Sequence, residues 1–435
     1  MSDMIKGLFD FLDSSPTCFH AAKNVADELD AAGYTRLWEN EEWKLKNDGK
    51  YYALRGQSAV VAFRTPEKRP VSFLLAAAHT DSPCFKIRQN CEVPSAGDTV
   101  RLSVEGYGGM VMRSWMDRPL SVAGRIFVKE KNGLASKLVC IDRDLLVIPG
   151  LAIHMNREMN KGVELKANVD MLPLFSGKGK NGAFLNLIAE TAGVSADAIV
   201  STELFLYPRT PATLFGLQEE FIAAPRIDDL ECAWGCLQGF LKAKKSQSMP
   251  VCCLFNNEEV GSGTRQGADS TFLDDVLRRV CASLGMTHQE YYAAAAQSFM
   301  VSADNGHAIH PAHPEYADGS EFPVLNGGIV IKYNAAQKYA TDGLSGALFT
   351  EVCKMAGVPF QRYSNRADLP GGSTLGHISC AHLSVPTADV GLPQLAMHSC
   401  CETAGARDIH HFVKALTVYY GLTLRRKDDR SVQFE

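Results

Sequence analysis

The chain has 435 residues, of which 46% are hydrophobic and 21% are charged, and its formal net charge is −5. This length and apolar content allow more than one core, so two domains are the natural expectation. The mixed charges give no basic footprint for nucleic acid, and no apolar run is long enough to span a membrane. We therefore predict neither a nucleic-acid partner nor a membrane partner.

The N-terminus and the cysteines indicate a compartment. The segment that starts with Met1-Ser2-Asp3 lacks the apolar core of a signal peptide. Thirteen cysteines, an odd number, are scattered without CxxC spacing. Such usage is typical of buried free thiols in a reducing environment. The sequence therefore predicts a cytoplasmic protein.

An early helix and strand precede the first candidate site residues. Apolar residues at helical spacing run up to Gly33, which ends the predicted helix. The apolar run at residues 73–78 then predicts a β-strand. This strand stops at His79 and Asp81, two side chains that are able to take part in metal chemistry.

Residues 89–217 have a different texture from the rest of the chain. They alternate apolar and polar positions, look extended at 122–128, and contain the hairpin turn signal Asn132-Gly133. We therefore predict an inserted β-rich domain at 89–217. It interrupts a catalytic domain that is made of residues 1–88 and 218–435.

After residue 217, helical and extended patterns alternate. Helices are predicted at 229–244, 271–284, 345–356 and 406–424, and strands at 251–255 and 299–303. Alternation of this kind predicts an α/β fold in which a mixed sheet is covered by helices on both faces.

Acidic residues stand at the ends of these elements. Glu258-Glu259 and Asp304 each follow a predicted strand, and Asp228 precedes a predicted helix. The carboxyl ends of strands form the mouth of the active site in α/β sheets. Because successive side chains of an extended segment point in opposite directions, one glutamate can bind a metal while its neighbour moves protons.

His398, after a further apolar segment, completes a set of histidine and carboxylate ligands that suits zinc, manganese or cobalt. Charge balance favours two divalent ions, because Asp228, Glu259 and Asp304 with one hydroxide supply four negative charges. Glu258, left uncoordinated, is then the expected general base.

Asp81 stands two residues beyond His79. At this spacing its carboxylate is expected to hold the imidazole in one tautomer.

Ordered motifs along most of the chain resemble the aspartyl aminopeptidase family, two-metal aminopeptidases related to yeast vacuolar aminopeptidase I. The matching motifs are AAAHTDSP, RIDDL, NNEEVGSGTRQGA, SADNGHAIHP, VIKYNAAQKYATDG, LPGGSTLGH and LAMHS, with YGG, MDRPLSVAGRI and LAIHMNR inside the inserted domain. The resemblance implies a zinc-peptidase-like α/β/α sandwich. It also implies one metal bound by His79, Asp228 and Asp304, and a second bound by Asp228, Glu259 and His398.

The resemblance further implies a substrate and an assembly. Peptides with a free N-terminus would lose an N-terminal Asp or Glu, with Lys332, Tyr339, Gly371 and Gly372 at the substrate. His154 would enter the active site of a neighbouring subunit. The inserted domain would build a tetrahedral homododecamer.

Three alternatives stay open at this point: an aminopeptidase for neutral residues, a related deacylase, and a non-catalytic assembly protein with structural metals. The last is disfavoured because a structural metal needs no uncoordinated base such as Glu258. The sequence departs from the family at Cys401, where a larger basic residue is expected. It also leaves open whether Cys400 or Cys401 reaches the metal beside His398.

Overall fold

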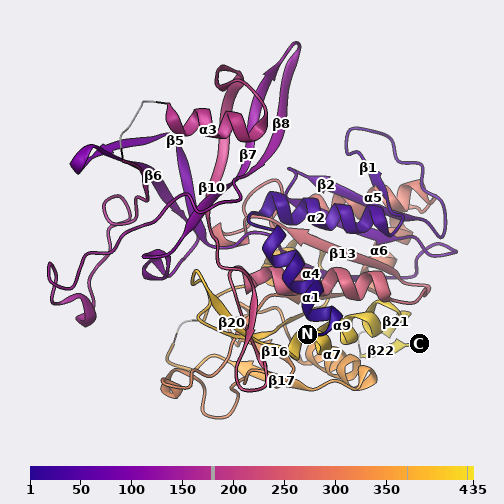
Figure 1. The fold of residues 1–435 in the computed structure, drawn as a ribbon. Coiled ribbons are helices and arrows are strands. Elements are labelled where there is room, and N and C mark those ends of the chain that lie inside the picture. Colours follow the sequence, from indigo (N-terminus) through magenta and orange to yellow (C-terminus); the bar gives the residue numbers. More distant parts are fainter. Residues whose placement is uncertain (178–181, 370, 429) are drawn as a thin grey trace.

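The computed structural model describes residues 1–177, 182–369, 371–428 and 430–435. The ribbon in Figure 1 shows a large α/β part and, projecting from it, a part built mainly of β-strands and α3. The predicted fold class is confirmed, because a mixed sheet lies between helices and a second, β-rich unit is inserted in the chain. The boundaries at 88/89 and 217/218 stay predictions.

Nine strands form the central sheet in the order β1-β2-β3-β13-β4-β14-β18-β16-β17. Their bounds are β1 Thr35–Leu37, β2 Lys50–Arg55, β3 Ala59–Arg64, β4 Phe73–His79, β13 Met249–Phe255, β14 Phe299–Ala303, β16 Ile329–Tyr333, β17 Phe360–Ser364 and β18 Thr387–Gly391. The neighbours β13, β4, β14 and β18 run parallel. Their carboxyl ends therefore lie at one edge of the sheet, where the candidate ligands follow.

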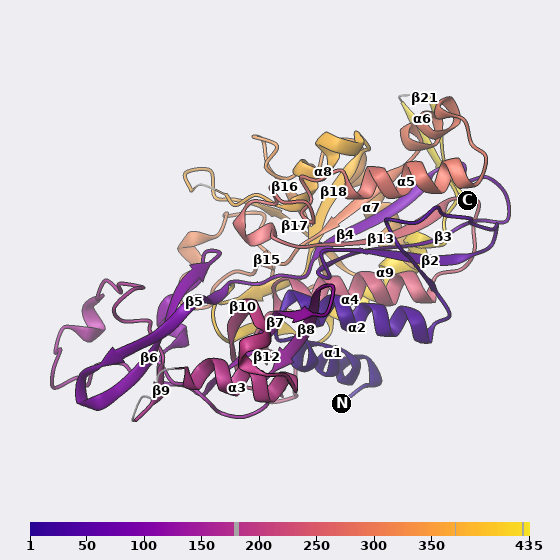
Figure 2. The ribbon, with the colours of Figure 1, turned by 90° about the horizontal axis from the view of Figure 1, so that it is seen from above.

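Helices cover both faces of this sheet, as Figure 2 shows from above. One face packs against α1 Asp3–Ser14, α2 Cys18–Ala31, α4 Ile227–Lys242, α7 Gly343–Ala356 and α9 Asp408–Tyr420, and the other against α5 Phe272–Ser283, α6 His288–Ala296 and α8 Leu375–Leu383. Side chains of β4 alternate between the two cores. Leu74 and Ala76 enter the first core, and Phe73 and Leu75 enter the second.

The second sheet has six strands in the order β8-β7-β10-β5-β6-β9, all paired antiparallel. Their bounds are β5 Cys84–Ser95, β6 Thr99–Tyr107, β7 Leu120–Glu130, β8 Gly133–Cys140, β9 Leu174–Ser176 and β10 Ile199–Pro208. The predicted hairpin turn joins β7 to β8, with Glu130 paired to Gly133. Helix α3, Ala183–Ala192, inserts Phe184 and Ile188 into the core of this sheet.

A five-stranded sheet of short strands lies beside the candidate site. Its order is β11-β12-β20-β19-β15, with bounds β11 Thr213–Phe215, β12 Phe221–Ala224, β15 Gly306–His307, β19 Pro393–Leu395 and β20 Glu402–Gly405. These strands lie near three candidate ligands in the sequence: Asp228 follows β12 by four residues, Asp304 precedes β15 by two, and His398 lies in the connection between β19 and β20. The C-terminal hairpin is β21 Leu424–Asp428 with β22 Ser431–Phe434.

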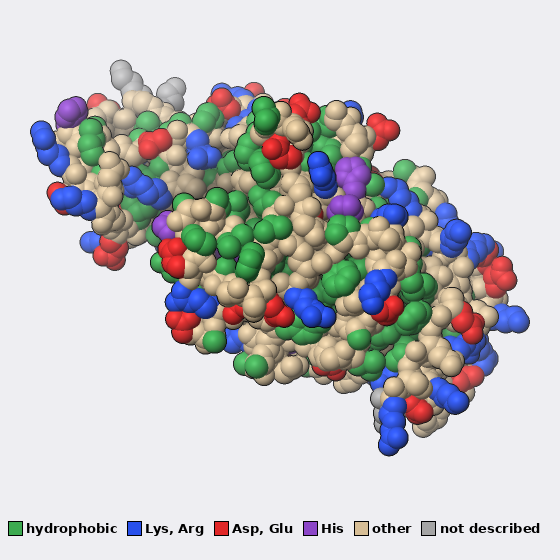
Figure 3. Space-filling view, turned by 90° about the horizontal axis from the view of Figure 1, so that it is seen from below, with side chains coloured by type: hydrophobic (Ala, Val, Ile, Leu, Met, Phe, Trp, Pro, Cys, Tyr) green, Lys and Arg blue, Asp and Glu red, His purple; other side chains and the backbone are tan. Residues whose placement is uncertain are grey.

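Charged side chains of both signs lie on the surface. On the face drawn in Figure 3, Lys and Arg side chains are interspersed with Asp and Glu, so neither sign forms a broad patch there. No helix in the described ranges has the length and apolarity needed to cross a bilayer.

Candidate metal centre

Strand β4 delivers His79 to the carboxyl edge of the central sheet. The His79 side chain is buried, and its Nδ1 lies 3.0 Å from the main-chain oxygen of Asp81. A carbonyl oxygen only accepts hydrogen bonds, so Nδ1 carries the proton and Nε2 presents its lone pair to the site. The Asp81 carboxylate lies further away, with Oδ1 3.6 Å from Nδ1. The backbone of Asp81, rather than the expected carboxylate, is therefore the nearer partner of the imidazole.

Helix α4 begins at the site and contributes Asp228 and Asp229, both buried. The Asp228 N–H donates to Oε2 of Glu402 at 3.0 Å, which fixes the backbone at the start of the helix. Asp229 accepts a 3.1 Å hydrogen bond from the His79 N–H. The two neighbouring acids therefore have different surroundings, and Asp228 alone faces both histidines.

Strand β13 ends two residues before a short 3₁₀ turn that carries Glu258 and Glu259. Their backbone N–H groups donate to the two oxygens of Asp81, each at 3.2 Å. The Glu259 side chain is 4% exposed and directs Oε1 to within 3.4 Å of His398 Nε2. Glu258 is partly buried, and within the described ranges no group donates a hydrogen bond to its carboxylate.

Asp304 and His398 close the ring of side chains. Asp304 directly follows β14 and is buried. His398 lies between β19 and β20, and its Nδ1 lies 2.9 Å from the main-chain oxygen of Gly109. By the argument given for His79, the Nε2 of His398 also presents a lone pair to the site.

Ligand-atom spacing tests whether cations fit here. The Nε2 of His79 is 3.4 Å from Asp228 Oδ1, and the Nε2 of His398 is 3.3 Å from Asp228 Oδ2. Ligand atoms about 2.0–2.1 Å from a tetrahedral ion lie about 3.3–3.4 Å apart. Asp228 Oδ1 and Glu259 Oε1 are buried without a hydrogen-bond partner. The geometry and the orphaned oxygens both fit divalent ions, with one oxygen of Asp228 for each ion.

Three overlapping groups of side chains have ligand atoms within 4.8 Å of one another in the described part of the chain. They are His79 with Asp228, Asp229 and Asp304, His79 with Glu258 and Glu259, and Asp228 with Glu259 and His398. The structure thus brings together all five predicted ligands and Glu258.

The pKa shifts of these groups indicate that the buried carboxylates are stabilised by positive charge nearby. Burial raises the pKa of Glu258 to about 8, an effect opposed by His79 and reinforced by Asp304. Burial alone would lower the pKa of His398, but hydrogen bonding and attraction to Asp228 outweigh it and raise the pKa to about 9. In the absence of metal, protons therefore supply part of the charge that buried carboxylates require.

Lys332 borders the metal centre on the Asp304 side. It is 2% exposed, its Nζ donates to the Asn305 carbonyl at 2.8 Å, and the same atom lies 3.7 Å from Asp304 Oδ1. The ammonium lies 5.6 Å from the centroid of the buried Tyr339 ring. Burial lowers the pKa of Lys332, but Asp304 together with smaller contributions from Tyr339 and Asp389 outweighs that effect, so the pKa is raised and the side chain stays charged.

Three other predicted residues lie outside the metal-capable groups. Gly371 is partly buried and its carbonyl accepts from Lys338 Nζ at 3.2 Å, whereas Gly372 is exposed; both precede α8. His154 is exposed on the segment between β8 and β9, which extends away from the central sheet in Figure 1. Within one subunit, His154 is not part of the metal centre.

The two cysteines near His398 take no part in the metal-capable groups of the described residues. Cys400 is buried in the core of the second sheet, and burial raises the pKa of its thiol to about 12. Burial also raises the pKa of the Cys401 thiol. Neither side chain is therefore predisposed to be a thiolate ligand.

Sequence reasoning missed Glu402 as part of the site. It is buried, accepts from the N–H of Asp228 and, at 2.7 Å, from that of His398, and burial raises its pKa to about 8. The only sequence signal was its position four residues after His398. Asp229 was also missed as a site residue, although it stands next to Asp228 in RIDDL.

Comparison with known proteins identifies relatives along nearly the whole chain. The family model described as aminopeptidase I zinc metalloprotease (M18) matches residues 11–420. A protein named "Probable M18 family aminopeptidase 2" from Clostridium acetobutylicum is 40% identical over 428 residues, which are 97% of this chain and 99% of the relative. The protein of the same name from Pseudomonas aeruginosa PAO1 is 39% identical over 427 residues, 96% of this chain and 98% of the relative.

Solved structures give the same result for the fold. The chain of the Ape4 and Nbr1 complex superposes with a TM-score of 0.93 at 33% identity, covering 96% of this chain and 85% of that one. The mApe1 dodecamer of S. cerevisiae superposes with a TM-score of 0.85 at 26% identity and 96% coverage of both chains.

Proposed function

The chain belongs to the M18 family of zinc aminopeptidases, and on that premise we propose that it uses two divalent ions to remove an acidic residue from the N-terminus of peptides. The observation that carries the two-ion proposal is the position of Asp228. One of its oxygens faces the Nε2 of His79 and the other faces the Nε2 of His398. A carboxylate that is shared in this way is the bridge that a pair of close cations requires.

We assign the ligands by proximity and donor type. One ion would be held by His79, Asp228 and Asp304, and the other by Asp228, Glu259 and His398. Imidazole and carboxylate donors favour zinc, and also accommodate manganese or cobalt. When bound, the ions would polarise the scissile carbonyl and lower the pKa of water.

Glu258 would then move the proton. Its carboxylate is partly buried at the edge of the ligand set and, in this assignment, binds neither ion. It would accept the proton of the attacking water and pass it to the departing amine of the shortened peptide. The hydrogen bonds from the Glu258 and Glu259 N–H groups to Asp81 keep the turn, and therefore both carboxylates, in place.

We base the proposed preference for an N-terminal Asp or Glu on Lys332. A buried ammonium beside the site attracts the carboxylate of an N-terminal Asp or Glu side chain, and Tyr339 next to it restricts the space. Gly371 and Gly372, without side chains, would let the backbone before α8 approach the substrate.

A Lys332→Met enzyme is therefore expected to lose its preference for acidic residues. A hydrogen bond between charged groups contributes about 1.5–3 kcal/mol, so the ratio of kcat/KM for aspartyl over leucyl substrates should fall about 10- to 100-fold. The measurement is a panel of aminoacyl substrates that includes glutamyl and aspartyl compounds.

Lys414→Met is the matched control, because Lys414 is an exposed lysine on α9. It should keep the wild-type ratio. If the wild-type enzyme cleaves leucyl but not aspartyl or glutamyl substrates, the neutral aminopeptidase or deacylase alternative replaces the acidic preference.

We propose a homo-oligomer, as in the dodecamer of the relative from S. cerevisiae, in which residues 89–217 make subunit contacts. Exposed apolar side chains on the 147–174 segment, among them Leu151 and Met155, support a buried interface there. His154 on this segment would reach the active site of a neighbour and stabilise the charge that develops on the substrate carbonyl oxygen.

Complementation between inactive chains tests this assignment of His154. His154→Ala and Glu258→Gln chains should each be nearly inactive, since one donor to a developing oxyanion contributes about 10²–10³-fold to kcat. Co-expressed chains should regain activity, because a mixed pair contains one site with both intact residues. Activity no higher than that of either variant alone would rule out contribution from a neighbour.

All thirteen cysteines are free thiols. We therefore keep a reducing compartment, the cytoplasm, as the proposed location.

A further inference from the structure

We infer that Tyr107, Gly108 and Gly109, at the end of strand β6 in the second sheet, form a positioning element for the metal ligands of the central sheet. The inference rests on the proposed two-ion site and adds to it a set of residues that bind neither ion nor substrate. Three independent contacts carry it, and each leads from this YGG segment to a different part of the ligand set.

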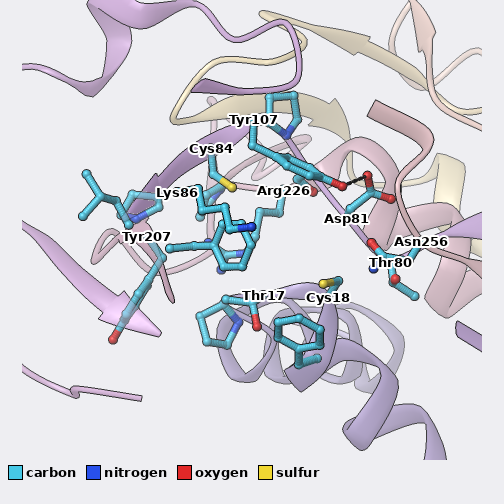
Figure 4. A pocket seen from close by; sticks show the side chains of 18 of the residues that line it. Thr17, Cys18, Thr80, Asp81, Cys84, Lys86, Tyr107, Tyr207, Arg226 and Asn256 are labelled. Atoms are coloured by element: carbon cyan, nitrogen blue, oxygen red, sulfur yellow. Dashed lines mark hydrogen bonds between the residues drawn. The ribbon is translucent and has the colours of Figure 1, made fainter. Parts of the chain in front are cut away.

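The first contact is the hydroxyl of Tyr107. It donates to Asp81 Oδ2 at 2.7 Å, and this hydrogen bond lies on the wall of the cavity in Figure 4. The same Asp81 carboxylate accepts the N–H groups of Glu258 and Glu259. Tyr107 therefore holds the Asp81 carboxylate in place. That carboxylate in turn holds the backbone turn that carries Glu258, the proposed base, and Glu259, a proposed ligand.

The hydroxyl of Tyr107 both donates and accepts a hydrogen bond. It accepts a 2.8 Å hydrogen bond from Asn257 Nδ2 while it donates to Asp81. Burial raises the pKa of Tyr107, and the charge of Asp81 raises it further, so the hydroxyl keeps its proton at any physiological pH. Asn257 directly precedes Glu258, which makes this a second connection from Tyr107 to the same turn.

The second contact is the close approach of Gly108. A Cβ atom at this position would lie 3.1 Å from the Cβ of Glu259, and the φ angle of Gly108 is +75°. Glycine meets both conditions without strain. The absence of a side chain here lets β6 pack directly against Glu259.

The third contact is the Gly109 carbonyl, which accepts from Nδ1 of His398 at 2.9 Å. Two residues later the N–H of Val111 donates to the main-chain oxygen of His398, also at 2.9 Å. The imidazole and the backbone of His398 are therefore both held by the segment that directly follows β6. Outer partners of this kind set the tautomer and orientation of a ligand.

The YGG segment thus touches Glu259 and His398, the two side chains that, with Asp228, make up one of the two proposed ion sites. Together with the link to Asp81, this predicts that the affinity of that ion depends on the position of β6. A cavity of about 100 Å³ separates the second sheet from the start of α2 behind Tyr107, with Tyr207 on its far side (Figure 4). Displacement of the second sheet would therefore loosen one ion in preference to the other.

The test compares zinc retention in Tyr107→Phe and Tyr207→Phe enzymes. Tyr107→Phe removes only the hydroxyl and keeps the ring that packs edge-on against Phe205. Tyr207 lies on the far side of the same cavity, and Tyr207→Phe removes a hydroxyl that donates to the Ile141 carbonyl at 2.8 Å and whose hydrogen bonds reach none of the proposed ligands. Zinc bound per chain is measured by elemental analysis across a series of chelator concentrations, beside kcat and KM.

We expect Tyr107→Phe to release one of its two zinc ions at chelator concentrations about 10- to 100-fold lower than wild type, while Tyr207→Phe retains both. kcat should fall in Tyr107→Phe and recover when zinc is added in excess. Gly108→Ala, which pushes on Glu259 directly, should release the same ion.

Equal zinc retention in wild type and Tyr107→Phe would overturn the inference and leave the proposed function intact. Equal loss in Tyr107→Phe and Tyr207→Phe would also overturn it, because the effect would then be general loosening of the second sheet. A wild-type enzyme that binds fewer than two zinc ions would instead refute the proposed two-ion site and, with it, this role for the segment.

Discussion

Replacing Asp228 by Asn is expected to abolish binding of both ions and to reduce turnover below detection while the chain still folds. Each oxygen of Asp228 faces a different histidine, so the substitution removes the one anionic group common to both proposed ion sites. An amide nitrogen at either position cannot coordinate a cation. Zinc per chain, measured after dialysis against metal-containing buffer, should fall from two to near zero.

The fold of the Asp228→Asn protein is expected to survive because the metal-free site is already short of positive charge. Asp229, Glu259 and Glu402 surround Asp228, and burial with carboxylate repulsion raises the pKa of each of these three. Removing one negative charge relieves that repulsion, although it also removes the attraction of His79 and His398 that holds the pKa of Asp228 below its usual value. The thermal midpoint in chelator should therefore lie close to that of metal-free wild type.

Glu231→Gln is the matched control for this experiment. Glu231 lies one turn further along α4, is equally buried, and has a pKa raised by burial to about 8, so it is largely neutral at pH 7. An amide there replaces a neutral acid of the same shape. This variant should keep two zinc ions, and a loss equal to that of Asp228→Asn would mean that any buried acid in α4 is required.

The sequence predicted the central sheet well because its signals were local. The runs that became β4, β13 and β14 are continuously apolar and end at polar residues, as parallel strands buried on both faces do. The candidate ligands were found for the same reason, since each follows or precedes such an element. Adjacent strands β13, β4 and β14 then place Glu258, His79 and Asp304 at one edge.

Helices whose sequences lack a clear periodicity of apolar residues were not predicted. Helix α6 has the sequence HQEYYAAAA, in which a run of alanines gives no apolar stripe, and α8 has only nine residues. Helix α1 is a different case, because Ile5, Leu8, Phe9 and Leu12 are all buried at helical spacing. Its periodicity is readable from the sequence, although no helix was predicted there.

The supporting contacts of the site could not have been predicted from spacing. Glu402 accepts the N–H of Asp228 across 174 positions of sequence, and Gly109 accepts from His398 across 289. Such pairs depend on how three separate sheets pack together. Periodicity reports which face of an element is buried, and it carries no information about which distant polar group will be the partner.

Glu258→Gln is expected to keep both zinc ions and to lower kcat by about 10²–10⁴-fold, the contribution usual for a positioned general base. The amide has the same shape but cannot accept the proton of water. Glu259→Gln, one residue away, should instead lose zinc. The ion lost is the one at the site that contains His398, because Glu259 Oε1 lies 3.4 Å from the His398 Nε2. Zinc content and kcat, measured on the same preparations, distinguish the two carboxylates.

The pH dependence of kcat distinguishes a general base at Glu258 from a residue that only maintains the structure of the site. A base acts only when ionised, so wild-type kcat should fall as the pH drops through the pKa of Glu258. Burial and neighbouring carboxylates raise that pKa to about 8 in the metal-free chain, and two bound cations would lower it. The acid limb is therefore expected below pH 8 in wild type and absent from the residual activity of Glu258→Gln. If that limb persists unchanged in the variant, another group moves the proton and Glu258 is not the base.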